Sequence, residues 1–593
     1  MQRRTLWIIL ATVGAVLVVL CGALSAGLLA YDVVSEPQGP VQGIPIAPPG
    51  QADEDAPTTT PRPAEQDEPT ATPRRPTPEP EPSATSAPGG DSPASPPAEA
   101  GPLPEGDVAA SLVPGSRAAL TERPDVPTYE ISAALDPQQH TITGEQHVTL
   151  TNTEDAALQA IYFRLPINAA HYDEGEITVS DVRVNGATVE PALEVDDTAL
   201  RLPLPAPLAP GERAEIELRF AATVPEGGGG YGLFSEQDGT FMLYNWHPEL
   251  AVYEDGGWLL NPIADQGDPT NTDVANYVVT FAAPENYTVI NSGVPTDQQA
   301  ATFVAALTRN FVVVASDQFE RATRQVGDTL VTSYYRPDDE PGGQAALETT
   351  VKSLELFGAQ FGPYPYTELD VVEVTLGGGA AGMESTGMIM IGSDYYDPAE
   401  SNPLADAGGL VEGVEGADVL AFTTAHEVGH QWWYSVVGSD AHTTPWLDEG
   451  LTNWSSAFYV EQVEGEAAGV LARDLFMGYP YRSTLSEGDI RLDQPVDQFS
   501  AQEYGAIVYG KGAIMYDVLR EELGDETFMA FLQRYYQEHA FERVTNQEWL
   551  QTLNAAAGRD MTPFYQKWVE GESIQESDLP PGGPLTELLS PGG

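Results

Sequence analysis

One motif, His426-Glu427-Val428-Gly429-His430, constrains this chain more than any other stretch of its sequence. Two histidines four residues apart lie on the same face of an α-helix, one turn apart, so both imidazoles can reach one metal ion. The glutamate after the first histidine then lies beside the metal, where it can take a proton from a metal-bound water. The motif predicts a buried helix that carries part of a zinc site. The alternative is a buried helix with two structural histidines.

A third ligand is expected from the segment that follows. Eighteen residues separate His430 from Glu449, and Thr444-Pro445 has the residue types of a helix start. We therefore expect one helix over residues 418–436 and a second over residues 445–462, with Glu449 in its early turns. Two histidines, one carboxylate and an open position make up a catalytic zinc site. The competing third ligands in this segment are Asp448 and His442.

Charge and cysteine content limit the classes of partner and metal site. The chain of 593 residues has 89 acidic and 26 basic residues, a formal net charge of −63. So acidic a surface repels phosphate backbones, which excludes nucleic acid as an expected partner. The single cysteine is Cys21, so the rest of the chain forms no disulfide and holds any metal through His, Asp and Glu.

The N-terminal region predicts export and anchoring. Residues 5–30 carry no charge and can cross a bilayer, which needs ~20 residues. Arg3 and Arg4 precede this run, so residues 1–4 should be a cytoplasmic tail. We predict a single-pass cell-membrane protein with an extracellular catalytic part; the alternative is secretion after signal cleavage. Residues 31–125 are rich in Pro, Thr, Ser and Glu and should form a disordered linker.

Two folded domains are expected after the linker. Residues 126–318 contain short alternating strands with turn residues between them, which predicts an antiparallel β sandwich or saddle-shaped sheet. Residues 319–575 mix strands and helices and contain the metal motif. Within them, the glycine-rich segment 377–392 is typical of an edge strand that brings backbone groups close to a ligand. Residues 576–593 should be a flexible tail.

Four stretches together resemble a known family. They are HEVGHQWW followed by WLDEGLTNW, the segment AGMES, the segment EYGAIVYGKGAIM, and, more diffusely, the stretches TYEISAALDPQQHTITGEQHVTLTN and FGPYPYTELDVVEV. Over roughly Thr128 to Glu570 the chain resembles the gluzincin zinc aminopeptidases, which are related to aminopeptidase N and leukotriene hydrolase. The resemblance implies a short two-domain form of the α+β class. An N-terminal antiparallel β domain would precede a thermolysin-like, mixed α/β and mainly helical zinc catalytic domain.

The resemblance also implies a role for each motif residue. One Zn²⁺ per chain would be held by two histidines and a glutamate, and a water activated there would attack a peptide carbonyl. A general base would move the proton, a tyrosine would stabilise the oxyanion, and a glutamate in the glycine-rich segment would hold the substrate's free amine. The zinc ligands would be His426, His430 and Glu449, the catalytic residues Glu427 and Tyr509, and the substrate-binding residues Gly382, Met383 and Glu384.

These inferences predict a zinc-dependent metallopeptidase that removes N-terminal residues from peptides. Ala381 and Ser385 stand where the family motif has Gly and Asn, so an endopeptidase or another zinc hydrolase remains an alternative. A catalytically silent surface binding protein on the same scaffold is a further alternative. The side-chain preference and the oligomeric state are left open by the sequence.

Overall fold

The computed structural model describes most of the chain after the predicted linker. Its described residues belong to one compact unit and comprise 106–172, 174–269, 271–297, 301–397, 418–485 and 487–589. The predicted cytoplasmic tail and membrane anchor lie outside these ranges. Within the described ranges, no helix has both the length and the apolar character needed to cross a membrane.

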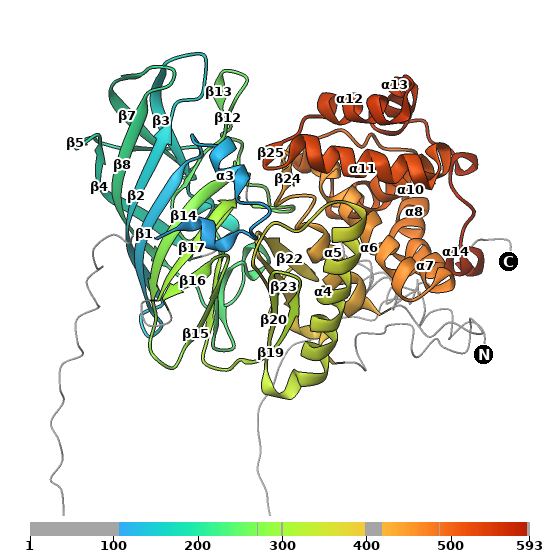
Figure 1. Cartoon of the computed structure of the whole chain (residues 1–593), viewed down its shortest axis with the longest axis horizontal. Coiled ribbons are helices and arrows are strands. Elements are labelled where there is room, and N and C mark those ends of the chain that lie inside the picture. The colour runs from blue at the N-terminus through green and yellow to red at the C-terminus, as the bar shows by residue number, and fades with distance from the viewer. Residues whose placement is uncertain are drawn as a thin grey trace, which may run out of the picture. The chain divides into compact units, whose positions relative to one another are not determined.

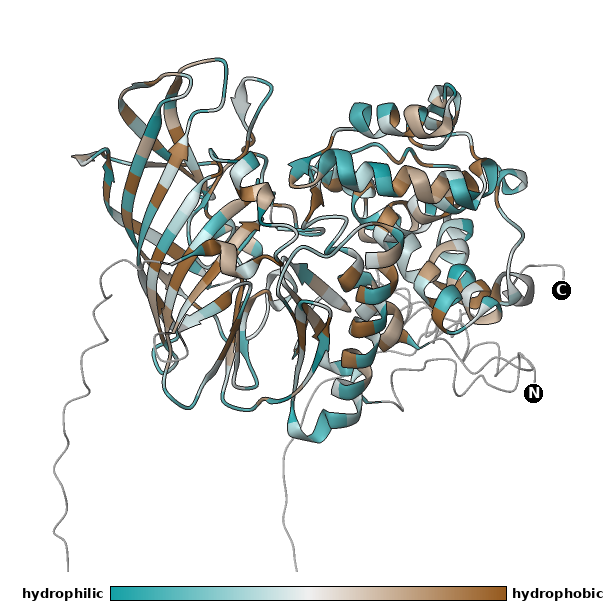
Figure 2. Ribbon diagram, viewed as in Figure 1, coloured by the Kyte–Doolittle hydropathy of each residue, from teal (hydrophilic) through white to brown (hydrophobic). Residues whose placement is uncertain are grey.

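The β-rich part is built around an eight-stranded sheet (Figure 1). Exposed and buried residues alternate along the whole of β8 (Arg213–Thr223), because successive side chains of a strand point to opposite faces. Figure 2 shows this alternation as brown and teal bands along the strands. In spatial order the strands are β16 (Val294–Asp297), β17 (Thr302–Thr308), β14 (Ala275–Ala282), β1 (Thr128–Asp136), β2 (Thr141–Thr151), β8 (Arg213–Thr223), β4 (Glu176–Val184) and β5 (Ala187–Thr188).

A four-stranded sheet shares an apolar core with this large sheet. The core includes Phe163 and Phe220, one from each sheet, and Trp246. The Trp246 ring lies edge-on to Phe281 with ring centroids 5.3 Å apart. The predicted β domain is confirmed, although β1 pairs with β14 in parallel rather than antiparallel. The strands of this second sheet are β11 (Glu249–Leu250), β3 (Leu158–Arg164), β7 (Ala199–Leu208) and β6 (Ala192–Glu194).

Another four-stranded sheet joins the β-rich part to the catalytic part. Met242 and Val314 from this sheet share an apolar cluster with Met383 and Met390 of the catalytic part. This shared cluster holds the glycine-rich segment against the β domain. The strands are β15 (Thr288–Asn291), β18 (Val313–Ser316), β10 (Thr240–Leu243) and β9 (Phe234–Gln237).

The catalytic part begins with a five-stranded sheet whose edge strand is β22 (Gly382–Ser385). The helix α4 (Glu340–Gln360) packs against β19 (Glu320–Val326) and β20 (Thr329–Tyr335). Gly343 permits this close packing, since a methyl group there would overlap the ring of Tyr335. The strand β22 is the edge strand that the sequence predicted. The other strands, in order toward β22, are β19 (Glu320–Val326), β20 (Thr329–Tyr335), β21 (Glu368–Val374) and β23 (Met388–Gly392).

Helices form the rest of the catalytic part, around a large apolar core. The predicted fold class, a β domain followed by a mainly helical catalytic domain, is confirmed. These helices are α5 (Val419–Gly429), α6 (Glu449–Val463), α7 (Glu466–Arg473), α8 (Tyr479–Leu485), α9 (Ala501–Glu503), α10 (Gly512–Leu523), α11 (Asp525–His539), α12 (Asn546–Ala557), α13 (Thr562–Trp568), and the π-helices Asp474–Gly478 and Tyr504–Lys511.

The two helices that carry the metal motif are shorter than predicted. The first, α5 (Val419–Gly429), ends before residue 436, because the following tryptophans turn into the core and Val437 pairs with β25 (Glu542–Arg543). The second, α6 (Glu449–Val463), is preceded by a separate 3₁₀ turn over Pro445–Leu447. Thr444 does not cap it, and its hydroxyl instead donates to the carbonyl of Asp440.

Two segments predicted to be unstructured are partly ordered. In the predicted linker, residues 108–111 and the helix α3 (Ala118–Glu122) are helical. The amide of Ala306 donates to the Ser111 hydroxyl at 2.9 Å. In the predicted tail, the helix α14 (Pro584–Leu589) is held because Asp474 accepts from the amide of Leu585 at 2.7 Å. Hydrogen bonds to residues far away in the sequence hold both of these segments, and the local composition of a segment does not predict such bonds.

Candidate active site

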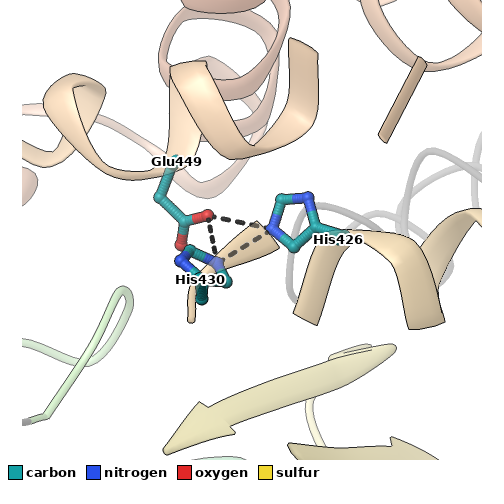
Figure 3. A group of neighbouring side chains, drawn as sticks. All are labelled: His426, His430 and Glu449. Carbon is teal, nitrogen blue, oxygen red and sulfur yellow. Dashed lines mark hydrogen bonds and ion pairs between the residues drawn. The ribbon is translucent and has the colours of Figure 1, made fainter. Parts of the chain in front are cut away.

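The two motif histidines and Glu449 lie together (Figure 3). Nε2 of His426 lies 3.1 Å from Nε2 of His430 and 3.2 Å from Oε2 of Glu449. Nε2 of His430 lies 3.4 Å from the same oxygen. Ligands about 2.1 Å from one tetrahedral zinc ion are about 3.4 Å apart, so these three atoms fit a single ion. Among the three candidate third ligands, Glu449 is the one that joins the two histidines.

Close packing between helices brings Glu449 to the histidines. The helices α5 and α6 pack against each other. A methyl group at Gly429 would lie 3.0 Å from Thr452 of α6, and one at Gly450 would lie 3.1 Å from Gly512 of α10. Both glycines therefore permit approaches that a larger residue would disturb. Glu449 is the first residue of α6, so its carboxylate leaves the helix end toward α5.

Asp448 orients His430 instead of joining the ligand set. Its Oδ1 lies 2.6 Å from Nδ1 of His430, the ring nitrogen that faces away from the other ligands. A carboxylate on the distal nitrogen fixes the ring and raises its basicity as a metal ligand. His442 lies apart from this group and lines a separate cavity.

Tyr509 reaches the ligand group from the π-helix Tyr504–Lys511. Its hydroxyl donates to Oε1 of Glu449 at 2.5 Å, on the oxygen opposite the histidines. The backbone carbonyl of Tyr509 accepts from the Asn453 side chain of α6 at 3.2 Å. Lys511, which is fully buried, fixes the end of this π-helix by donating to Asp489 at 2.8 Å.

A cavity of about 700 Å³ opens beside the ligand group. It is lined by all eight residues that the sequence resemblance assigned to the site, by further residues of the catalytic part, and by a loop of the β domain. The lining residues are Tyr231, Gln266, Gly267, Asp268, Ala380, Ala381, Gly382, Met383, Glu384, Thr423, His426, Glu427, His430, Glu449, Tyr504 and Tyr509.

Two carboxyls in this cavity are buried without a complete set of partners. Glu384 and Glu427 are 2% and 4% exposed, and Oε1 of Glu384 and Oε2 of Glu427 have no hydrogen-bond partner among the described residues. Burial raises the pKa of Glu384 to about 7 and raises the pKa of Glu427 well above its ordinary value. Buried polar groups are normally hydrogen-bonded, so these oxygens indicate a ligand that supplies donors.

The strand β22 places these carboxyls. Glu384 lies on the strand itself, and Gly382 packs against Glu427. A methyl group on Gly382 would overlap the Glu427 carboxyl. Only glycine at position 382 therefore leaves room for the Glu427 side chain. Met383 lines the cavity and also packs into the apolar cluster shared with the β domain.

Asp268 is a site residue that the sequence did not predict, and it lies on a loop. Asp268 comes from the β domain, and its burial and the charge of Glu384 raise its pKa well above the ordinary value. Gln266 fixes the loop to the catalytic part by donating to the carbonyls of Val496 and Phe499 at 3.0 and 2.7 Å. Tyr231, also in the cavity, has a left-handed backbone with φ of 61°. Asp268 is one of many acidic residues in this chain and belongs to no motif with a recognisable spacing, so the sequence alone does not identify it.

Comparison with known proteins agrees with this geometry. A model of the peptidase family M1 domain matches residues 345–568. Aminopeptidase M1-B of Oryza sativa subsp. japonica is 27% identical over 282 residues, which cover 46% of this chain and 29% of that protein. Aminopeptidase 2, mitochondrial, of Saccharomyces cerevisiae is 24% identical over 310 residues, which cover 51% of this chain and 30% of that protein. The matched part thus spans less than a third of these curated relatives.

A solved structure extends the likeness over the fold. The crystal structure of an M1 zinc metallopeptidase from Deinococcus radiodurans matches with a TM-score of 0.54 and 19% sequence identity, and the match covers 77% of this chain and 96% of that one. The family resemblance read from the motifs is confirmed. In the catalytic part of this chain, residues 345–568 match the peptidase family M1 domain.

Proposed function

We propose that this protein is a zinc-dependent aminopeptidase. The observation that carries the proposal is the ligand group His426, His430 and Glu449 in one cavity with two buried, partly unpartnered carboxyls, Glu384 and Glu427. A bound zinc ion supplies Lewis-acid chemistry that polarises a carbonyl and acidifies water. The two relatives and the solved structure named above are aminopeptidases or an M1 zinc metallopeptidase by their names, which supports the same activity here.

Glu427 is the general base in this proposal. Its unpartnered Oε2 faces no protein donor, which leaves it free to accept a proton from the attacking water. It then delivers that proton to the nitrogen of the leaving peptide. A positioned acid–base group of this kind contributes about 10²- to 10⁴-fold to a reaction rate.

Glu384 and Asp268 hold the free α-amine of the substrate. The two carboxyls come from different domains and face the same cavity. An ammonium group donates three hydrogen bonds, and its positive charge compensates buried carboxylates that are otherwise costly. The distance from this ammonium site to the ligand group then selects the first peptide bond, which makes the enzyme an exopeptidase.

Tyr509 stabilises the charge that develops on the substrate carbonyl. Its hydroxyl lies beside the ligand group and lines the cavity. A donor fixed before the reaction is worth more than one that must reorganise during it. Tyr504 lines the same cavity and is a secondary candidate for this role.

We also propose that residues 5–30 anchor the protein in the cell membrane, with the catalytic part outside the cell. The absence of charge in this run and the two arginines before it support the proposal. The full chain should fractionate with membranes, and deletion of residues 1–30 should release it into the soluble fraction. A soluble product of lower mass than the full chain would instead indicate cleavage and secretion.

The activity is tested with two matched substrates. Wild type should hydrolyse leucine p-nitroanilide and should leave N-acetyl-leucine p-nitroanilide intact, because acetylation removes the ammonium. Glu384→Gln should weaken the discrimination between the two. Cleavage of internal bonds in N-blocked peptides would favour an endopeptidase. Equal inactivity of wild type and Glu427→Gln toward peptides would favour a silent binding protein.

A further inference from the structure

A second cavity of about 590 Å³ lies next to the active-site cavity. The two cavities share Gln266 and Asp268 as lining residues. Asp268 is one of the carboxyls assigned to the substrate amine, so the second cavity begins where the first residue of a substrate would be held.

Glu249 lines this second cavity and lacks a complete set of partners. It is 2% exposed. Its Oε2 accepts from Nδ2 of Asn245 at 2.7 Å, whereas its Oε1 has no hydrogen-bond partner among the described residues. The strand β11 fixes the backbone of Glu249 by pairing it with Arg164 of β3. Burial raises the pKa of Glu249 to about 7, so a positive group beside it would favour its ionised form.

The other walls of the cavity are suited to the stem of a long side chain. Leu259, Ile263 and Val496 give it apolar surface. Arg164 also lines the cavity, but its guanidinium donates to the backbone carbonyls of Leu259 and Asn261 at 3.4 and 2.7 Å. Arg164 therefore fixes the loop that forms one wall. Oε1 of Glu249 and Oδ1 of Asn271 are left as unpartnered acceptors among the described residues, and only the Glu249 carboxyl can carry a charge.

We propose that this cavity is the subsite for the side chain of the substrate's N-terminal residue, and that Glu249 selects lysine or arginine there. The proposal rests on the aminopeptidase function. The α-ammonium would be held by Glu384 and Asp268, the methylene stem would lie along the apolar wall, and the charged head would donate to Oε1 of Glu249. Long basic side chains are stable in this arrangement, with the stem on apolar surface and the head on a carboxylate.

The test compares lysine p-nitroanilide with norleucine p-nitroanilide, two substrates that differ mainly in the terminal ammonium. Wild type should favour lysine in kcat/KM by about tenfold or more, as expected for a charge-assisted hydrogen bond to a buried carboxylate. Glu249→Gln should abolish most of this preference. The glutamine can still accept from Asn245, so the local fold is retained. Glu217→Gln removes an exposed charge of the same domain, on β8, and should leave the preference unchanged.

A second variant and a binding measurement keep the proposal testable if Glu249→Gln folds poorly. Ala264→Phe narrows the cavity from another wall and should lower kcat/KM for lysine and arginine substrates more than for an alanine substrate. Calorimetric titration of the Glu427→Gln variant with lysinamide and norleucinamide reads the preference without turnover. An unchanged lysine-to-norleucine ratio in folded Glu249→Gln would overturn the subsite, even with aminopeptidase activity intact. Failure to cleave any free-amine substrate would instead overturn the proposed function.

Discussion

The metal side and the substrate side of the active-site cavity differ in how completely their polar groups are paired. On the metal side, Nδ1 of His430 faces Asp448, and Oε1 of Glu449 accepts from Tyr509. On the substrate side, Glu384 and Glu427 each keep an oxygen without a partner among the described residues. The metal side is therefore organised by the protein alone, whereas the substrate side is completed by a ligand that brings donors.

The two sides also differ in where their residues come from. The ligand group and Asp448 come from residues 426–449, which span the end of α5 and the start of α6. The substrate side combines the edge strand β22 with a loop of the β domain that contains Asp268. A metal site built from adjacent helices of one domain keeps its geometry when the two domains shift slightly relative to each other. The substrate side depends on domain contacts such as the hydrogen bonds of Gln266.

The largest effect is expected on the substrate side, from Glu427→Gln. The amide cannot accept the proton from water, so kcat should fall by about 10³-fold with zinc content unchanged. Steady-state kinetics on leucine p-nitroanilide and metal analysis of the same sample check this. A loss of zinc together with activity would mean that Glu427 belongs to the metal side.

A stability measurement sharpens the contrast between paired and unpaired carboxyls. Glu249 has a folded-state pKa of about 7 against an ordinary value of 4.5. The folded protein thus binds more protons than the unfolded chain between these values, and its free energy of unfolding falls as pH rises through that window. Relative to Glu249→Gln, wild type should lose about 3 kcal/mol between pH 4 and pH 8. The free energies of unfolding of both proteins are measured in urea across this range. Equal changes with pH in the two proteins would contradict the assigned environment of Glu249.

Tyr509→Phe tests a residue that bonds to the metal side and also lines the cavity. Loss of the hydroxyl removes the donor for the developing oxyanion, so kcat should fall by about 10²-fold with a small change in KM. Because the same hydroxyl bonds Glu449, zinc affinity should fall slightly. Kinetics at saturating zinc separate the two effects. Full recovery of kcat by added zinc would assign Tyr509 to metal binding alone.

The smallest effect is expected from Asp448→Asn on the metal side. The amide keeps the shape of the side chain but loses the charge that supports His430, so zinc affinity should weaken by about tenfold. Competition with a chelator at fixed free zinc measures this. Activity at saturating zinc should stay close to wild type, and a large loss there would place Asp448 in the reaction itself.

The same contrast explains what the sequence could predict. The spacing of His426, His430 and Glu449 identified the ligand group because helical geometry brings those side chains together over a short stretch. Alternation along strands such as β8 likewise predicted the β domain. The end of α5 at Gly429 was not predicted, because that glycine lies inside the metal motif and no proline or further glycine follows before Gly438; the turn arises from tertiary packing. Asp268 and Glu249 were missed for a related reason: they reach their cavities through contacts between distant segments.

The most direct test of the central claim is zinc stoichiometry by native mass spectrometry of wild type, Glu427→Gln and His430→Ala. We predict one zinc ion per chain in wild type and in Glu427→Gln, and none in His430→Ala. One zinc ion retained in His430→Ala, or none in wild type purified with zinc present, would contradict the assignment of His426, His430 and Glu449 as the ligands of a catalytic metal.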